Sequence, residues 1–411
     1  MADSILSISA LGNDVGGIGT GDDGRRVFVR GALPEETVRC RITKEKKSFL
    51  QARLLEVVIP SPHRTEAFCS HYGECGGCSL QHLSYGRQLF WKGQWISRAL
   101  KRGGIPFPGP VEVIPSPAER EYRNRVSFDI LQGIPGLHRY HGDVMPIDDC
   151  PLLNSPGRDI YRSLMGMLPL NAGRVSVRSS VQTGESMVEF SGGQGVRCIA
   201  LEGVTVTAWK TGKQWRREPS DAFFHEEVGA IVHRVLPGAF CQVNTGCAGL
   251  LVSAVVKAVE PESRILDLYG GSGAFSLPLA RSAARVTSVE LSADSSEGGI
   301  ETARSAGIEN VEFVNCRVRR FLTDTVDAED QWDTVVLDPP RAGLGIRVAR
   351  LLRRVRTDRI VYVSCNPFSL ARDLGVLQDG GWTVARVTGY DMFPQTDHVE
   401  TLVILERDGE R

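Results

Sequence analysis

The sequence lacks any apolar run long enough to span a membrane, and its first residues, Met1 to Leu6, have no basic lead followed by a long apolar core. It also lacks internal repeats, low-complexity tracts and a strong net charge, since the formal charge at pH 7 is -1. These absences predict a cytoplasmic protein with no membrane partner. Local basic patches would have to attract any nucleic acid, because the molecule as a whole has almost no net charge.

The chain is long and contains many cysteines. With 411 residues, of which 42% are hydrophobic, the chain is too long to fold around one ordinary hydrophobic core, so we expect two or three domains. Ten cysteines in a reducing compartment favour metal, cluster or catalytic roles over a disulfide framework.

Residues 1–59 have the pattern of a small β-barrel. Short strand-like runs such as 26–29 and 37–42 alternate with glycine, proline and acidic turns. The lysines within 44–47 either follow phosphates or form a solvated face. The prolines of Pro60–Pro62 then interrupt the pattern and indicate a linker.

Residues 60–235 predict a mixed α+β central region. An amphipathic helix is predicted over 84–102, and it can pack on the domain that follows. We expect Lys92 to lie outside the buried stripe of this helix. That stripe is formed by Leu89, Trp95, Ile96 and Leu100.

From about residue 236 onward, helix and strand segments alternate, which predicts a parallel, doubly wound sheet. The glycine-rich segment Asp267–Gly273 follows a predicted strand and precedes a predicted helix, where such sheets bind ligands. Glu290, at the end of the next strand, can accept the hydroxyls of a ribose. Taken alone, the segment fits a plain turn, a dinucleotide or S-adenosylmethionine, and the last tolerates a shorter loop because it has no phosphate.

Cys365 lies in Ser364–Pro367, directly after the apolar strand 360–363. A cysteine beside such a strand is often a small buried hydrophobe. Its position on the loop at the functional edge of the sheet favours a nucleophilic thiol instead.

A second group of cysteines precedes the central strands. Cys69, Cys75 and Cys78 share one short segment, and Cys150 follows from a distant one. Four thiolates suit zinc or an iron-sulfur cluster, and a purely structural set of thiols is a third possibility. Zinc ligands usually come in two pairs, which this spacing does not provide.

Several motifs together resemble the RNA uridine-5-methyltransferase family, of the ribosomal-RNA type, over nearly the whole chain. The N-terminal stretches Gly16–Gly19 and 27–36 resemble the TRAM module, an OB-like RNA-binding barrel. The other matching motifs are the cysteine set, the glycine-rich segment, Asp338–Arg341, Ser364–Pro367 and His398–Thr401.

The resemblance implies an α/β fold with three parts. A TRAM-like OB β-barrel would occupy 1–59, and a mixed α+β domain with the iron-sulfur cysteines would occupy 60–235. A Rossmann-like class I methyltransferase domain would occupy 236–411.

The resemblance also implies a mechanism and its residues. Carbon 5 of uracil is a poor nucleophile until a group adds to carbon 6, and a thiolate is suited to that addition. Cys365 would form the adduct and Glu400 would remove the proton from carbon 5. The cofactor contacts would be Gln242, Tyr269, Glu290 and Asp338. A 4Fe-4S cluster would be held by Cys69, Cys75, Cys78 and Cys150. The RNA contacts would include Arg123, Arg125 and Arg341.

The expected product is 5-methyluridine in large-subunit ribosomal RNA, made by a monomer, and transfer RNA is the alternative substrate. A second alternative is a non-catalytic RNA-binding iron-sulfur protein on a methyltransferase scaffold. Ala274, which stands where the family usually has Asn, favours it. A second departure from the family is that 294–299 is richer in Ser and Gly than the helix expected there, and both departures bear on cofactor affinity and local geometry. Cytosine methyltransferases resolve their adduct with a second cysteine, and Cys316 lacks a matching motif.

Overall fold

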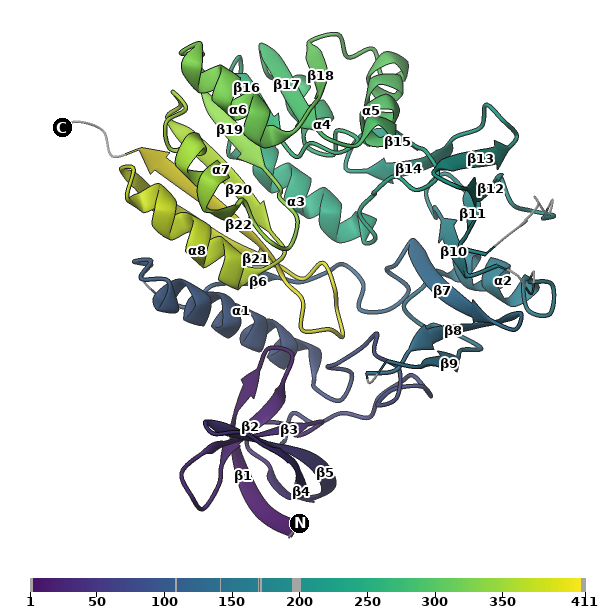
Figure 1. The fold of residues 1–411 in the computed structure, drawn as a ribbon, viewed down its shortest axis with the longest axis vertical. Helices are drawn as coiled ribbons and strands as arrows, with labels where there is room; N and C mark the ends of the chain where they lie inside the picture. The colour runs from purple at the N-terminus through teal and green to yellow at the C-terminus, as the bar shows by residue number, and fades with distance from the viewer. Residues whose placement is uncertain are drawn as a thin grey trace.

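The computed structural model describes residues 3–107, 109–140, 142–168, 170, 172–193 and 201–407. Figure 1 shows a small barrel at one end, a large helix-covered sheet at the other, and a further sheet to one side. Among the described helices, none is long and apolar enough to cross a membrane.

The N-terminal strands form a closed barrel in the order β1-β2-β3-β5-β4. Alternate residues along the strands point inward, and Leu6, Ile8, Val27 and Val29 are buried. The predicted barrel is therefore confirmed. Its strands are β1 (Asp3–Gly12), β2 (Gly16–Thr20), β3 (Arg26–Arg30), β4 (Thr37–Glu45) and β5 (Phe49–Ile59).

The predicted amphipathic helix is α1 (Tyr85–Arg102), and Gly103 follows its last turn. Trp95, Ile96 and Leu100 are buried as expected. The expectation for Lys92 was wrong, because its side chain is fully buried and its Nζ donates to Asp391 Oδ1 at 2.5 Å. The partner carboxylate lies far along the chain, so helical periodicity alone could not reveal it.

The central sheet has seven strands in the order β13-β12-β11-β10-β7-β8-β9. Its core includes a stack of the Phe128 and Tyr161 rings, whose centroids lie 4.0 Å apart. Tyr161 belongs to α2 (Ser155–Ser163), which packs beside β10. The strands are β7 (Arg125–Leu131), β8 (Ile134–His138), β9 (Val144–Pro146), β10 (Arg174–Ser179), β11 (Ser186–Ser191), β12 (Val206–Thr211) and β13 (Gln214–Glu218).

A hairpin of β14 (Phe224–Val228) and β15 (Ile231–Val235) leads from the central sheet to an eight-stranded sheet, in the order β18-β17-β16-β19-β20-β22-β21-β6. The strands β16 to β20 are parallel to their neighbours in that group, as predicted for a doubly wound fold. These strands are β16 (Arg264–Leu268), β17 (Arg285–Glu290), β18 (Val311–Asn315), β19 (Thr334–Leu337) and β20 (Arg359–Ser364).

The remaining strands extend one side of this sheet. The strand β22 (Glu400–Arg407) is antiparallel to both β20 and β21 (Trp382–Tyr390). The short strand β6 (Val113–Ile114), which follows α1 in sequence, pairs parallel with β21. Strand order reverses between β16 and β19, and ligands bind at such a switch point.

Helices cover both faces of the large sheet, and on one of them the helices lie side by side in the order α6, α7, α8 and α1 (Figure 1). The Ser- and Gly-rich stretch 294–299 nevertheless forms a helix, α5, because Ser292 caps it by accepting from the Ser295 N–H. The helices are α3 (Thr245–Lys257), α4 (Ser276–Ala280), α5 (Ala293–Ser305), α6 (Val318–Asp327), α7 (Gly345–Leu352) and α8 (Pro367–Gln378).

Candidate active site

The glycine-rich segment turns sharply at the carboxyl end of β16. Tyr269, Gly271 and Gly273 all have positive φ, at 64°, 57° and 87°. A non-glycine residue in this region is strained, and such strain is concentrated at functional sites. At Gly270 an added Cβ would lie 2.1 Å from Ser288 Oγ, so only glycine fits.

Three of the predicted cofactor residues, Gln242, Tyr269 and Asp338, line one cavity with the glycine segment. The fourth, Glu290, lies beside it. Its Oε2 accepts from the Gly271 N–H at 3.1 Å, and its Oε1 accepts from the Ser292 N–H at 2.7 Å. The structure thus brings all four side chains to the switch point of the sheet.

Asp338 lines this cavity, and the charge of the fully buried Asp267 acts on it. Burial raises the pKa of Asp267 to about 7, and burial together with the Asp267 charge raises the pKa of Asp338 to about 7. Asp267 Oδ1 is buried without a hydrogen-bond partner among the described residues. A cationic ligand would stabilise both carboxylates, and the sulfonium and ammonium groups of S-adenosylmethionine fit that requirement.

Cys365 and Glu400 come from adjacent strands. Cys365 directly follows β20, Glu400 begins β22, and the register pairs Ser364 with Thr401. Because the flanking residues are paired, the thiol and the carboxylate are held at the same edge of the sheet.

The electrostatics of the two groups are linked. Burial raises the pKa of Glu400 well above its usual value, Asp338 raises it further, and Arg341 opposes the shift. Burial, with Glu400 and Asp338 adding to it, raises the pKa of Cys365 to about 12, and Arg341 again opposes the shift. In the protein alone the thiol is therefore protonated, and a buried Glu400 oxygen has no hydrogen-bond partner among the described residues.

The loop that carries Arg341 is fastened to the thiol loop. Asn366 Nδ2 donates to the Arg341 carbonyl at 3.1 Å, and Ser369 Oγ donates to the same oxygen at 3.0 Å. These bonds fix the backbone, while the Arg341 side chain is exposed and faces solvent.

The loop Asp391–His398, which leads directly to Glu400, is held by distant segments, and sequence reasoning missed this. The yellow loop after β21 reaches toward α1 and the barrel (Figure 1). Its backbone oxygens accept hydrogen bonds from Asn13, Ser79, Leu80, Lys92, Tyr122 and Asn244. Backbone carbonyls give no sequence signal, so no pattern could have predicted these contacts.

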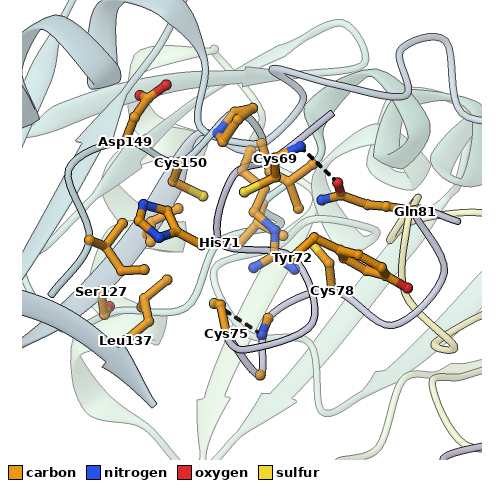
Figure 2. A pocket seen from close by; sticks show the side chains of 18 of the residues that line it. Cys69, His71, Tyr72, Cys75, Cys78, Gln81, Ser127, Leu137, Asp149 and Cys150 are labelled. Atoms are coloured by element: carbon orange, nitrogen blue, oxygen red, sulfur yellow. Dashed lines mark hydrogen bonds between the residues drawn. The ribbon is translucent and has the colours of Figure 1, made fainter. Parts of the chain in front are cut away.

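The four predicted cysteine ligands line one cavity of about 540 Å³, although they come from two distant segments (Figure 2). None forms a disulfide. Burial raises the pKa of Cys69, Cys75 and Cys78, the last to about 12, and the Cys150 thiol adds to each shift. The four thiols therefore lie within electrostatic reach of one another.

The cavity does not have the geometry of a single-ion site. Among the described residues, no group of three or more His, Cys, Asp or Glu side chains is close enough to hold one metal ion. Four thiols that line one cavity supply the donor types that an iron-sulfur cluster uses.

Arg123 and Arg125 line the cysteine cavity and are only partly exposed. Arg125 pairs with Glu189 at 2.9 Å, and Arg123 Nε donates to Tyr122 Oη at 3.4 Å. Both guanidinium groups thus have partners inside the protein, and their contact with RNA stays a prediction.

The fold and the cofactor cavity define an S-adenosylmethionine-dependent methyltransferase with an N-terminal barrel. Residues 226–408 match the tRNA (Uracil-5-)-methyltransferase family model, and residues 6–55 match the TRAM domain. The chain belongs to the RNA (uracil-5-)-methyltransferase family, and it is an enzyme of that class.

Relatives match over almost their entire length. The 23S rRNA (uracil(1939)-C(5))-methyltransferase RlmD of Alkalilimnicola ehrlichii is 33% identical, covering 98% of this chain and 97% of the relative. That of Vibrio campbellii is 32% identical, covering 93% and 91%. The tRNA (uracil-54, C5)-methyltransferase of Pyrococcus abyssi, solved with S-adenosyl-L-homocysteine, has a TM-score of 0.76 and 26% identity, covering 97% of this chain and 99% of that one.

Proposed function

We propose that this enzyme methylates carbon 5 of one uridine in large-subunit ribosomal RNA. The observation that carries the proposal is the meeting of Cys365 and Glu400 at the sheet edge, beside the cavity lined by Gln242, Tyr269 and Asp338. Ribosomal RNA is favoured because relatives that match along their full length bear that name. Transfer RNA is the second candidate, because the Pyrococcus abyssi enzyme acts on it by name.

In this proposal Gln242, Tyr269, Glu290 and Asp338 hold S-adenosylmethionine, which supplies an electrophilic methyl group when bound. Cys365 Sγ loses its proton to solvent and adds to carbon 6 of the uracil, and the electron pair of the carbon 5–carbon 6 double bond then makes carbon 5 nucleophilic toward that methyl group. Glu400 then takes the proton from the methylated carbon 5, and the carbon-sulfur bond breaks to release Cys365. The raised pKa of Glu400 makes its carboxylate a stronger base than an ordinary glutamate.

The target uridine must leave its stack for Cys365 to reach carbon 6, so an unpaired or extruded base is required. We propose that Arg341 contacts this base, and its exposed side chain on a backbone fixed beside the thiol loop supports that role. Arg123 and Arg125 are the other proposed RNA contacts.

The first experiment is mass spectrometry of nucleosides from unmodified ribosomal and transfer RNA, incubated separately with the enzyme and S-adenosylmethionine. New 5-methyluridine, absent with Cys365→Ala, is the expected result, and it identifies the RNA class. RNA that binds but gains no methyl group in either sample would contradict the proposal and favour the non-catalytic scaffold.

The role of Glu400 has its own test. Glu400→Gln removes the base but keeps the shape, so the covalent Cys365–RNA adduct should accumulate on a denaturing gel. Glu406→Gln, on the exposed end of the same strand, is the matched control and should leave no adduct. Normal turnover by Glu400→Gln would remove Glu400 from the mechanism.

We also propose that Cys69, Cys75, Cys78 and Cys150 hold a 4Fe-4S cluster with a structural role. Ser79 and Leu80, directly after Cys78, donate to the Gln395 carbonyl at 3.0 and 2.9 Å, which links the cluster segment to the loop before Glu400. Anaerobically purified protein should contain iron and sulfide, and Cys150→Ser should lose both. Stoichiometric zinc without sulfide would overturn the cluster.

The proposed enzyme has three functional units in one chain. The barrel, the seven-stranded sheet and the eight-stranded sheet support functional units at 1–59, 60–235 and 236–411, although α1 and β6 of the middle unit pack on the large sheet. We propose a monomer that works in the cytoplasm, where ribosomal RNA is modified.

A further inference from the structure

A groove between α6 and α7 is lined mainly by arginine. It has a volume of about 820 Å³. Its exposed arginines are Arg317, Arg319, Arg320, Arg347, Arg350 and Arg354. This concentration of positive charge is unexpected in a chain whose formal net charge is -1.

These exposed arginines have almost no carboxylate partners within the part of the chain that the structure describes. Among the described residues, their one ion pair joins Arg320 to Asp324 at 3.9 Å, and both side chains are more than 70% exposed. By contrast, Arg158 contacts two carboxylates, Glu121 and Asp149. The groove therefore has charge that the protein itself does not neutralise.

The spacing along α7 makes this arrangement unfavourable in isolation. Arg347 and Arg350 lie three residues apart on α7, so their like charges are neighbours on one face, and Arg354 follows in the turn just after the helix. On a surface that contacts only water, this repulsion between like charges destabilises the helix. An anionic ligand would turn it into attraction.

The groove starts at the edge of the sheet that carries the active site. Asn315 is paired in register with Glu290, and Arg317 follows it just before α6. The helix α7 begins at Gly345, soon after Arg341, whose backbone is fastened beside Cys365. The two helices that line the groove, α6 and α7, therefore both run away from the loops that carry the cofactor and thiol residues.

We propose that this groove binds the phosphates of the RNA that flanks the target uridine. The inference rests on the proposed function, in which RNA is the substrate, and it adds a binding surface on the catalytic unit itself. Guanidinium groups bind phosphate oxygens in a forked geometry, and contacts to the backbone position RNA without reading its sequence. The groove thus orients the RNA, and the active site selects the base.

The test compares two triple variants. Arg347→Ala/Arg350→Ala/Arg354→Ala removes three groove charges. Arg281→Ala/Arg285→Ala/Arg304→Ala removes three exposed arginine charges from α4–β17 and α5, outside the groove. The affinity for a fluorescein-labelled, unmodified 23S ribosomal RNA transcript is measured by anisotropy between about 50 and 200 mM salt.

Each lost phosphate contact should make the slope of log affinity against log salt shallower by about one. We therefore expect the groove variant to lose affinity at low salt and to have a slope shallower by about two to three. The control variant should keep the wild-type slope, and lysine at the three groove positions should restore it.

Equal slopes for the groove variant and the wild type would overturn the proposal, as would equal losses in both triple variants, because net charge would then explain them. Methylation is measured separately on the same RNA. A wild type that binds RNA with the expected slope difference but never methylates it would refute the proposed function and leave the groove intact.

Discussion

Replacing the buried Lys92 should destabilise the protein strongly and slow the reaction. Lys92 and Asp391 are both fully buried, so Lys92→Met leaves an unpaired carboxylate in the interior. Breaking a buried ion pair in this way destabilises by about 3–5 kcal/mol. The lost hydrogen bond from Lys92 Nζ to the Phe393 carbonyl, 3.0 Å long, adds about 0.5–1.5 kcal/mol. Since whole domains are stable by about 5–15 kcal/mol, the change is a large fraction of the total.

Urea denaturation measures the loss of stability, and methyl transfer to RNA measures the loss of rate. Lys101→Met, at the exposed end of the same helix, is the control and should be nearly neutral. Replacing both members of the pair, with Lys92→Met/Asp391→Leu, should recover most of the stability, because no charge is then left unpaired. A Lys92→Met protein as stable as Lys101→Met would refute the reasoning.

Two further predictions concern the chemistry and the cofactor. Glu400 works as a base only when it is deprotonated, so kcat/KM should rise with pH through its raised pKa, above the range of an ordinary glutamate. Arg341 opposes the upward shift of this pKa, so Arg341→Ala should move the rise in kcat/KM to higher pH. An unmoved pH profile would show that Arg341 does not act on the base. Gly270→Ala forces a Cβ against Ser288 Oγ, so it should destabilise by about 1–3 kcal/mol and weaken S-adenosylmethionine binding in calorimetry. Gly86→Ala, where an added Cβ meets nothing within 4 Å, should do neither, and equal behaviour of the two would contradict the steric argument.

Much of the fold could be predicted because its signals are local. The barrel follows from short alternating strands, and α1 follows from the spacing of Trp95, Ile96 and Leu100. The parallel sheet follows from alternating helices and strands. The antiparallel β21 and β22 and the addition of β6 were not predicted, because strand pairing depends on distant partners.

The candidate site divides in the same way. Its individual motifs were visible in the sequence, and the structure brings Cys365, Glu400 and Asp338 together at one edge. The burial of Lys92 could not be foreseen, because Asp391 becomes its neighbour only when β21 folds beside α1. The arginine groove was also missed, since its two walls are separate helices in the sequence.

The contacts of the Asp391–His398 loop determine how the protein can be divided. Asn13 of the barrel donates to the Asp397 carbonyl at 2.8 Å, and Leu11 packs in one apolar cluster with Trp91 and Trp95 of α1. A fragment trimmed to 236–407 would keep the reactive thiol and the carboxylate, but would lose α1, β6 and nearly every donor to the loop between them. The smallest fragment that works as an enzyme is therefore close to the whole chain. A barrel taken from a relative can replace this one only if it keeps the contacts that Leu11 and Asn13 make with α1 and with the loop.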